Sequence, residues 1–217
     1  TADWLCLLVV TDPDAGYGGF SQIIVPTNTP GFTYQLLDKI GNWGSDTGAV
    51  YLEDVRVPVT DTIGDIGRGF QQQMAQFQDE RLIALLSSNA GSLQLWKQTV
   101  AYGRDRSVFG KPVTKFQFNQ FRLVDLMMRI HAARELGYHC VRKRCRGEDA
   151  TLEISMGKIF CIEVAQQVAT VCMQLHGGAG YMKENVAGRA FVDTRLASIG
   201  GGADEVMMQV ISRMLGL

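Results

Sequence analysis

One glutamate lies where a carboxylate is least expected, next to an apolar run. Glu80 follows Phe77 closely and precedes Leu82–Leu86, which holds only apolar residues. A carboxylate in such surroundings costs free energy unless it is paired or used. At helical spacing, Glu80 is followed by small residues at positions 84, 87 and 91, which leave room for a ligand. Glu80 is therefore a candidate general base, although an exposed polar stripe on a helix explains the same residues equally well.

A second cluster combines cations with an aromatic ring. Arg106 and Lys111 flank Phe109 and Gly110 in a short connecting segment. A guanidinium can grip phosphate oxygens with two hydrogen bonds, and a phenyl ring can stack on a flat ligand. The segment is thus a candidate site for a phosphate-bearing, planar ligand. A polar loop at the end of a helix is the alternative.

Two glycine-rich segments complete the candidate chemistry. Gly177 and Gly178 end one helical stretch, and Gly200–Gly202 precede another that begins near Asp204. Glycines let a backbone approach a ligand closely, and the free N–H groups at a helix start suit an oxyanion or phosphate. The first of these segments does not run from a strand into a helix, so the dinucleotide fingerprint does not apply to it. A glycine cap, or ordinary acids in a first helical turn, would explain them without a ligand.

The cysteines and histidines indicate neither a metal site nor a disulfide framework. There are five cysteines and three histidines, and no pair of cysteines has CxxC spacing. We expect the cysteines of the helical region to be small buried residues in a reducing compartment. They are Cys140, Cys145, Cys161 and Cys172.

Composition places the chain among ordinary globular proteins. Of 217 residues, 46% are hydrophobic and 20% are charged, and the formal net charge is −1. Such a balance gives no electrostatic reason to expect nucleic acid or an anionic membrane as a partner. No run of apolar residues is long enough to predict a membrane span.

The elements that must position these residues fall into two regions. Residues 1–66 are rich in β-formers, glycine and proline, with strands predicted at 5–10, 19–25 and 49–57. The strand at 5–10 is so apolar that it needs neighbours on both sides, so we expect the chain to begin partway through a domain. Residues 67–217 are predicted to form helices at 69–104, 117–146, 150–176 and 204–215.

The third predicted helix carries a packing seam. Its apolar and small residues recur at alternating steps of three and four, which is typical of a helix bundle. They are Ile154, Gly157, Cys161, Val164, Val168, Val171 and Leu175. The predicted fold is mostly α: an antiparallel four-helix bundle, preceded by the later strands of a β domain.

Taken together, these motifs resemble the acyl-CoA dehydrogenase family over essentially the whole chain. The matching segments are Pro30-Gly31-Phe32, Lys39-Ile40-Gly41, Gly44–Thr47, Asp79–Leu82, Arg106–Lys111, Phe116-Gln117, Gln174–Tyr181, Arg195 and Ile199–Val206. The resemblance implies FAD as cofactor and an acyl-CoA as substrate. It also implies an electron-transfer flavoprotein or similar acceptor, and a homodimer or homotetramer. The expected location is the cytoplasm, or the mitochondrial matrix in a eukaryote.

The resemblance also implies roles for particular residues. Arg106, Phe109 and Gln117 match positions that contact the pyrophosphate and adenine half of FAD. Gln174, Leu175, His176, Gly177 and Gly178 match a loop that contacts the cofactor from a neighbouring subunit, and Ala203, Asp204 and Glu205 match a turn beside the flavin. The positions around the acyl group are Gln78, Asp79, Arg81, Gly201 and Gly202.

The chain departs from the commonest family pattern at the position of the catalytic base. Many members carry a catalytic glutamate where this chain has Gly201, which cannot accept a proton. Isovaleryl-type members place the base in a Glu-Arg-Leu segment of the first bundle helix, which Glu80-Arg81-Leu82 matches. The implied reaction is α,β-desaturation, in which Glu80 removes the α-proton and the Gly201 N–H binds the thioester oxygen. The space left by glycine favours branched acyl groups.

Three other functions remain open from the sequence. The chain could be a non-catalytic, FAD-binding assembly subunit of a mixed complex, as the unusual glycine turn allows. It could belong to a flavin monooxygenase or oxidase, because a fold does not determine its chemistry. It could also be a helical interaction domain without enzyme activity.

Overall fold

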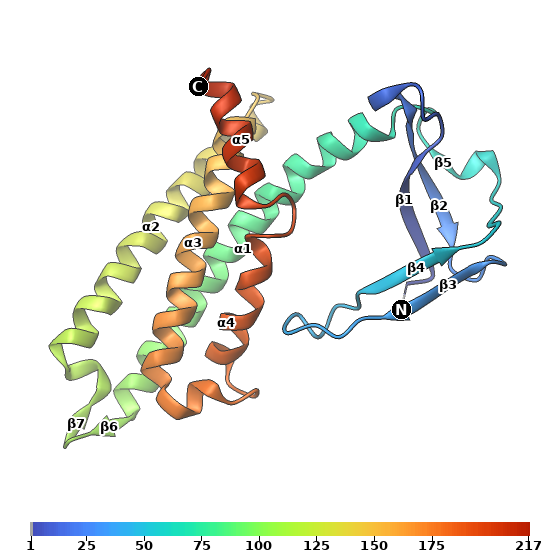
Figure 1. The fold of residues 1–217 in the computed structure, drawn as a ribbon. Coiled ribbons are helices and arrows are strands. Elements are labelled where there is room, and N and C mark those ends of the chain that lie inside the picture. The colour runs from blue at the N-terminus through green and yellow to red at the C-terminus, as the bar shows by residue number, and fades with distance from the viewer. Residues whose placement is uncertain (1) are drawn as a thin grey trace. The chain divides into compact units, whose positions relative to one another are not determined.

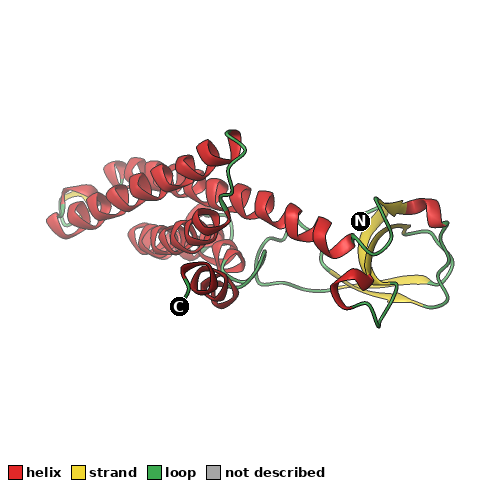
Figure 2. Cartoon of the chain, turned by 90° about the horizontal axis from the view of Figure 1, so that it is seen from above, coloured by secondary structure: helices red, strands yellow, loops and turns green. Residues whose placement is uncertain are grey.

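The computed structural model describes residues 2–217, and its contacts divide them into two units. The first unit ends at Phe77 and the second spans Gln78–Leu217, so the boundary falls within the long helix α1 (Gly69–Asp105). The first unit contains strands β1 to β5 joined by loops, and the second consists mainly of helices (Figures 1 and 2). The predicted boundary after residue 66 marks the change from strands to helix, whereas the contacts group the first turns of α1 with the strands.

The first unit holds two antiparallel strand groups. One has the order β1-β2-β5 and the other is the hairpin β3-β4; the strands are β1 (Trp4–Val10), β2 (Phe20–Pro26), β3 (Phe32–Leu36), β4 (Gly48–Leu52) and β5 (Thr62–Ile63). The predicted strands at 5–10 and 19–25 are confirmed. The predicted strand at 49–57 is too long, because Asp54 has a φ of 51° and turns the chain. β3 and β5 were not predicted.

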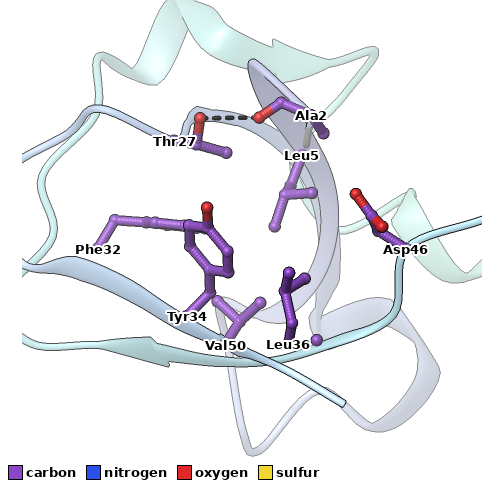
Figure 3. Close-up of a pocket in the computed structure, with 9 residues that line it drawn as sticks. Ala2, Leu5, Thr27, Phe32, Tyr34, Leu36, Asp46 and Val50 are labelled. Carbon is purple, nitrogen blue, oxygen red and sulfur yellow. Dashed lines mark hydrogen bonds between the residues drawn. The ribbon is translucent and has the colours of Figure 1, made fainter. Parts of the chain in front are cut away.

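Alternate residues of β3 face a hollow in this unit. Phe32, Tyr34 and Leu36 share one face of the strand, and with residues of β1 and β4 they line a pocket of about 220 Å³ (Figure 3). At its edge the Thr27 hydroxyl donates a 2.9 Å hydrogen bond to the Ala2 carbonyl. None of the predicted site residues lines this pocket.

The start of α1 packs closely on β2. The ring of Phe70 stacks on Tyr17, with the centroids 4.5 Å apart. A Cβ at Gly69 would lie 2.5 Å from the backbone of Ser21, so only glycine allows this approach. The glycine of the loop-to-helix junction is therefore a packing residue.

The second unit contains the four predicted helices and one more. The bounds of α2 (Gln117–Cys145), α3 (Thr151–His176) and α5 (Asp204–Leu215) lie within one residue of the prediction. A hairpin, β6 (Ser107–Val108) and β7 (Lys111–Pro112), joins α1 to α2. The additional helix α4 (Val186–Ala197) was missed, because it is only 12 residues long and Gly188 lies in its first turn. Within residues 2–217, none of the helices is long and apolar enough to cross a bilayer.

Side-chain contacts define the directions of the long helices. On α1, Asn89 donates to the Ile130 carbonyl and Trp96 donates to the Leu123 carbonyl, so α1 and α2 are antiparallel. The ammonium of Lys143 on α2 lies 2.6 Å from the Glu153 carboxylate on α3, and further along, the Cys161 thiol of α3 donates to the Ala133 carbonyl of α2, so these helices are antiparallel as well.

The fourth position of the bundle is shared by α4 and α5, which follow one another along α3 (Figure 1). Asn185, before α4, bonds to His176 at the end of α3, and Gln166 further back on α3 bonds to Ser198 after α4. The four-helix prediction is therefore confirmed as an architecture, with two short helices in place of one.

The predicted seam of α3 forms the core. Ile154, Gly157, Cys161, Val164 and Val168 are buried, while Val171 and Leu175 are partly buried. Three of the four helical cysteines are buried as expected. Cys145 is exposed, because it lies in the last turn of α2 on the outer face, and the expectation of burial was wrong for this residue.

The ends of the helices agree with their sequence signals. Gly147 follows α2 with a φ of 72°, the left-handed conformation of a helix cap. The Asp149 carboxylate accepts hydrogen bonds from the backbone N–H and the hydroxyl of Thr151, at 2.9 and 2.6 Å. Asp149 lies one residue before the N-cap, Ala150, and satisfies donors of the first residue of α3 from there.

Candidate active site

Arg81 connects α1 to the glycine turn before α5. Its side chain is buried, and its Nε donates a 2.9 Å hydrogen bond to the Gly201 carbonyl. A Cβ at Gly202 would lie 2.8 Å from Met207 Cε and 3.3 Å from Arg81 Nη2, and Gly202 has a φ of 102°. Burial lowers the pKa of Arg81, and the nearby Glu80 carboxylate opposes this effect. The turn thus requires glycine at position 202, both for space and for conformation.

The residues beside Arg81 lie in different environments. Glu80 is on the exposed side of α1, as are Ser87 and Gly91, and no atom lies within 4 Å of a Cβ built at Gly91. Asp79 forms a 2.6 Å surface ion pair with Arg144 of α2, so its carboxylate is engaged away from the turn. The Oε1 atom of Gln78 is buried and accepts no hydrogen bond within residues 2–217. The face of α1 that carries Glu80 is therefore open. This agrees with a face that binds a ligand and equally with an exposed polar stripe.

The glycine turn presents several free donors. The N–H of Asp204 donates to the Ser198 carbonyl at 3.2 Å, which closes the turn. In the part of the chain that the structure describes, the N–H groups of Gly201, Gly202 and Ala203 donate no backbone hydrogen bond. Gly201 has a φ of 68°, so two successive left-handed residues expose these groups. Such a turn can bind an oxyanion.

Lys158 also contacts the glycine turn, although it is not among the site residues predicted from the sequence. Its side chain is only 1% exposed, and its Nζ donates to the Gly202 carbonyl at 2.5 Å. Asp204 Oδ1 lies 3.5 Å from the same Nζ. Burial lowers the pKa of Lys158, and the Asp204 carboxylate opposes the shift. The sequence feature that could have indicated its burial is its position between Gly157 and the apolar segment Ile159–Ile162.

A second cluster surrounds the end of α3. Arg106, Leu175, His176, Gly177 and Gly178 line one pocket of about 420 Å³, together with Tyr102, Val108, Val113 and Ala179. The Arg106 side chain is exposed and makes no ion pair among the described residues. A Cβ at Gly177 or Gly178 would meet no atom within 4 Å. Arg106 from one predicted group of cofactor residues and Leu175–Gly178 from another therefore line the same pocket of one chain, although they are far apart in sequence.

His176 is buried within this cluster and bonded on both sides. Its Nδ1 lies 3.2 Å from Asn185 Nδ2, and its Nε2 lies 3.2 Å from Thr99 Oγ1. The imidazole also stacks on Tyr102, with centroids 4.2 Å apart. The Asn185 Oδ1 already accepts from the Ala187 N–H, so the amide nitrogen faces the imidazole and Nδ1 is an acceptor. His176 thus supports the Gly177–Gly178 turn with both ring nitrogens engaged.

Six predicted cofactor residues do not line this pocket: Phe109, Gln117, Gln174, Ala203, Asp204 and Glu205. Phe109, at the tip of the β6–β7 hairpin, is 97% exposed and has a φ of 48°. Gly110 follows with a φ of 79°, so the hairpin turn has two positive φ values, as in a type I′ turn. Gln117 and Gln174 are exposed at the start of α2 and near the end of α3. Glu205 is likewise exposed in the first turn of α5.

Comparison with known proteins decides the family. Residues 67–216 match the C-terminal domain of acyl-CoA dehydrogenases. The chain belongs to the acyl-CoA dehydrogenase family. A probable acyl-CoA dehydrogenase of Bacillus subtilis is 38% identical over 197 residues, covering 90% of this chain and 52% of that protein. A probable short/branched chain specific acyl-CoA dehydrogenase of Dictyostelium discoideum is 33% identical over 204 residues, covering 93% and 49%.

The fold agrees with solved members of the acyl-CoA dehydrogenase family. A probable acyl-CoA dehydrogenase from Mycobacterium abscessus superposes with a TM-score of 0.96 at 34% identity, covering 99% of this chain and 57% of that one. The chain spans about half the length of the curated relatives that it matches. Both the strands and the bundle are thus those of the family.

Proposed function

We propose that this protein is a flavin-dependent acyl-CoA dehydrogenase that desaturates the α,β-bond of an acyl thioester. The observation that carries the proposal is the hydrogen bond from Arg81 to Gly201. It joins the helix that carries a carboxylate, Glu80, to a turn that carries free backbone donors. A base and an oxyanion-binding turn are the two protein groups that removal of an α-proton requires.

The residues of the second cluster fit a flavin adenine dinucleotide. The unpaired Arg106 lies beside the open Gly177–Gly178 backbone, and this combination suits a diphosphate. The exposed ring of Phe109 offers a flat surface for stacking. We infer that Arg106, Gly177 and Gly178 hold the diphosphate, and that Phe109 contacts the adenine half. A bound flavin supplies the acceptor for the hydrogen that leaves the β-carbon as hydride.

The protein groups have separate tasks in this mechanism. The N–H groups of the turn at 201–203 bind the thioester oxygen, which gains negative charge as the α-proton leaves. Glu80 takes that proton, and Arg81 keeps the turn beside the helix that carries Glu80. Gly201 and Gly202 leave the space above the turn free of side chains, which favours a substrate branched near the reacting carbons.

The test is an anaerobic titration of the flavin-loaded protein with isovaleryl-CoA, longer 3-methyl thioesters and straight-chain thioesters. Loss of the oxidised-flavin absorbance is the expected result, strongest with branched thioesters. Bleaching only by short straight chains would contradict the branched substrate. A bound flavin that no thioester bleaches would favour the assembly subunit, and rapid reoxidation by oxygen would favour an oxidase or monooxygenase.

A further inference from the structure

Two buried cationic side chains donate hydrogen bonds to the carbonyl groups of the glycine turn before α5. Arg81 on α1 donates to the Gly201 carbonyl, and Lys158 on α3 donates to the next carbonyl, that of Gly202. Both side chains are buried, Lys158 almost completely. Two successive peptide groups of one short turn are therefore each bonded to a positive charge that comes from a different helix.

Peptide geometry determines where the opposite ends of these groups point. In a trans peptide the C=O and the following N–H point in opposite directions. The N–H of Gly202 therefore points away from Arg81, and the N–H of Ala203 points away from Lys158. A cation bonded to the carbonyl also draws charge through the peptide group, which strengthens its N–H as a donor.

The positive charge of Lys158 is only partly balanced nearby. Asp204 Oδ1 is 3.5 Å from Nζ, farther than the Gly202 carbonyl at 2.5 Å, and the Asp204 side chain is 36% exposed. Arg81 and Glu205 are the other charged groups that act on Lys158. A buried ammonium costs free energy of folding unless it is well paired, and its partners here are the Asp204 carboxylate at 3.5 Å and the exposed Glu205. A function of this charge would explain why the cost is tolerated: it can act on a molecule that is bound at the turn.

We propose that Lys158 is a positioning residue for the desaturation reaction: it fixes the Gly202–Ala203 peptide and lends positive potential to the N–H groups that face the thioester oxygen. The proposal rests on the proposed function. Lys158 touches the carbonyl side of the turn, so it acts through the backbone. It should therefore favour a bound enolate, which is negative, over a bound enoyl thioester, which is neutral.

The test compares two thioesters on the flavin-loaded protein. A 3-ketoacyl-CoA binds as its enolate and an enoyl-CoA binds as a neutral molecule, and flavin absorbance reports both. In Lys158→Met we expect the enolate to bind about 10- to 100-fold more weakly, and the enoyl-CoA to bind within about threefold of wild type. The pH at which the bound 3-ketoacyl ligand ionises should rise by about one unit or more. Lys97→Met, an exposed lysine of α1, is the matched control and should change neither value.

Lys158→Gln serves if Lys158→Met does not fold, since it keeps a donor for the Gly202 carbonyl without the charge. Equal weakening of both ligands, or unchanged binding of the enolate, would overturn the role of Lys158. A wild-type protein that retains flavin but binds neither thioester would instead overturn the proposed function. The two failures are thus distinguishable.

Discussion

At the scale of single residues, neighbouring side chains of α1 have different tasks. Asp79 pairs with Arg144, and Arg81 bonds to the Gly201 carbonyl. Glu80 lies between them on the exposed face, beside the open stripe of Ser87 and Gly91. Of the three, Glu80 is the carboxylate that a bound thioester could reach on that face.

Glu80→Gln tests the assignment of the base. The amide keeps the size of the side chain but cannot accept the α-proton, so turnover should fall by about 10²- to 10⁴-fold. Flavin content and the binding of an enoyl-CoA should be unchanged. Steady-state turnover with the best thioester measures the effect. Glu135→Gln, an exposed carboxylate of α2, should retain full activity, and full activity of Glu80→Gln as well would refute the assignment.

The buried His176 predicts a loss of stability in weak acid. Burial lowers the pKa of His176 below its ordinary value of 6.5. As the pH falls below that value, the unfolded chain binds the proton before the folded one, so the free energy of unfolding decreases. Above about pH 6.5 the contribution is fully present.

Urea unfolding at a series of pH values measures this effect. His176→Gln cannot titrate, so its stability should fall less than that of wild type between about pH 7.5 and pH 5.5. His139→Gln removes an exposed histidine of α2 and should behave like wild type. An identical pH dependence in wild type and His176→Gln would exclude His176 as the group responsible.

At the scale of elements, one leucine joins three helices. Leu85 of α1 is fully buried, and a Cβ built at Gly137 of α2 or Gly157 of α3 would lie 3.2 Å from its methyl groups. The two glycines therefore leave the space that Leu85 fills. This explains why glycine occupies the interior of two helices in spite of its low helix propensity.

Leu85→Ala should lower the free energy of unfolding by about 2–5 kcal/mol, because it leaves a cavity at the helix crossing. Ile83→Ala is the matched control on the same helix. Ile83 is 63% exposed, so its truncation should cost about 0.5 kcal/mol or less. Chemical denaturation followed by helical circular dichroism measures both. Similar losses for the two variants would show that α1 does not pack at this crossing.

At the scale of the whole molecule, one aromatic side chain stands out by its exposure. Phe109 is 97% exposed in a left-handed conformation that is unfavourable for an aromatic residue. The two-residue hairpin turn accounts for the positive φ but not for the choice of phenylalanine. In the proposed function, this ring contacts the adenine half of FAD.

Phe109→Asn separates the ring from the turn. Asn-Gly is a preferred pair for a type I′ turn, so the hairpin should fold as well as in wild type or better. Loss of the stacked ring should weaken flavin binding by about tenfold, measured by equilibrium release of FAD at increasing dilution. Sedimentation of the same samples shows whether the oligomer persists. Unchanged flavin affinity would mean that Phe109 faces solvent or protein instead.

Much of the fold could be predicted from the sequence because it depends on local patterns. The three- and four-residue steps in Ile154–Leu175 predicted the packed face of α3. The fourth bundle position was predicted only in part, since α4 is short and Gly188 in its first turn weakens the helical signal. The motifs around Glu80, Arg106 and the glycine segments were also visible in the sequence, as was the resemblance that they carry together.

Only the tertiary structure decided which of these residues meet. Arg81 and Lys158 lie far from Gly201 and Gly202 in sequence, and the bundle brings all four together because α1 and α3 both pack beside the start of α5. A lysine in an amphipathic helix is ordinarily exposed, so its type gave no sign of burial. Burial depends on what the neighbouring helices cover, and that is a property of the assembled bundle rather than of any single segment.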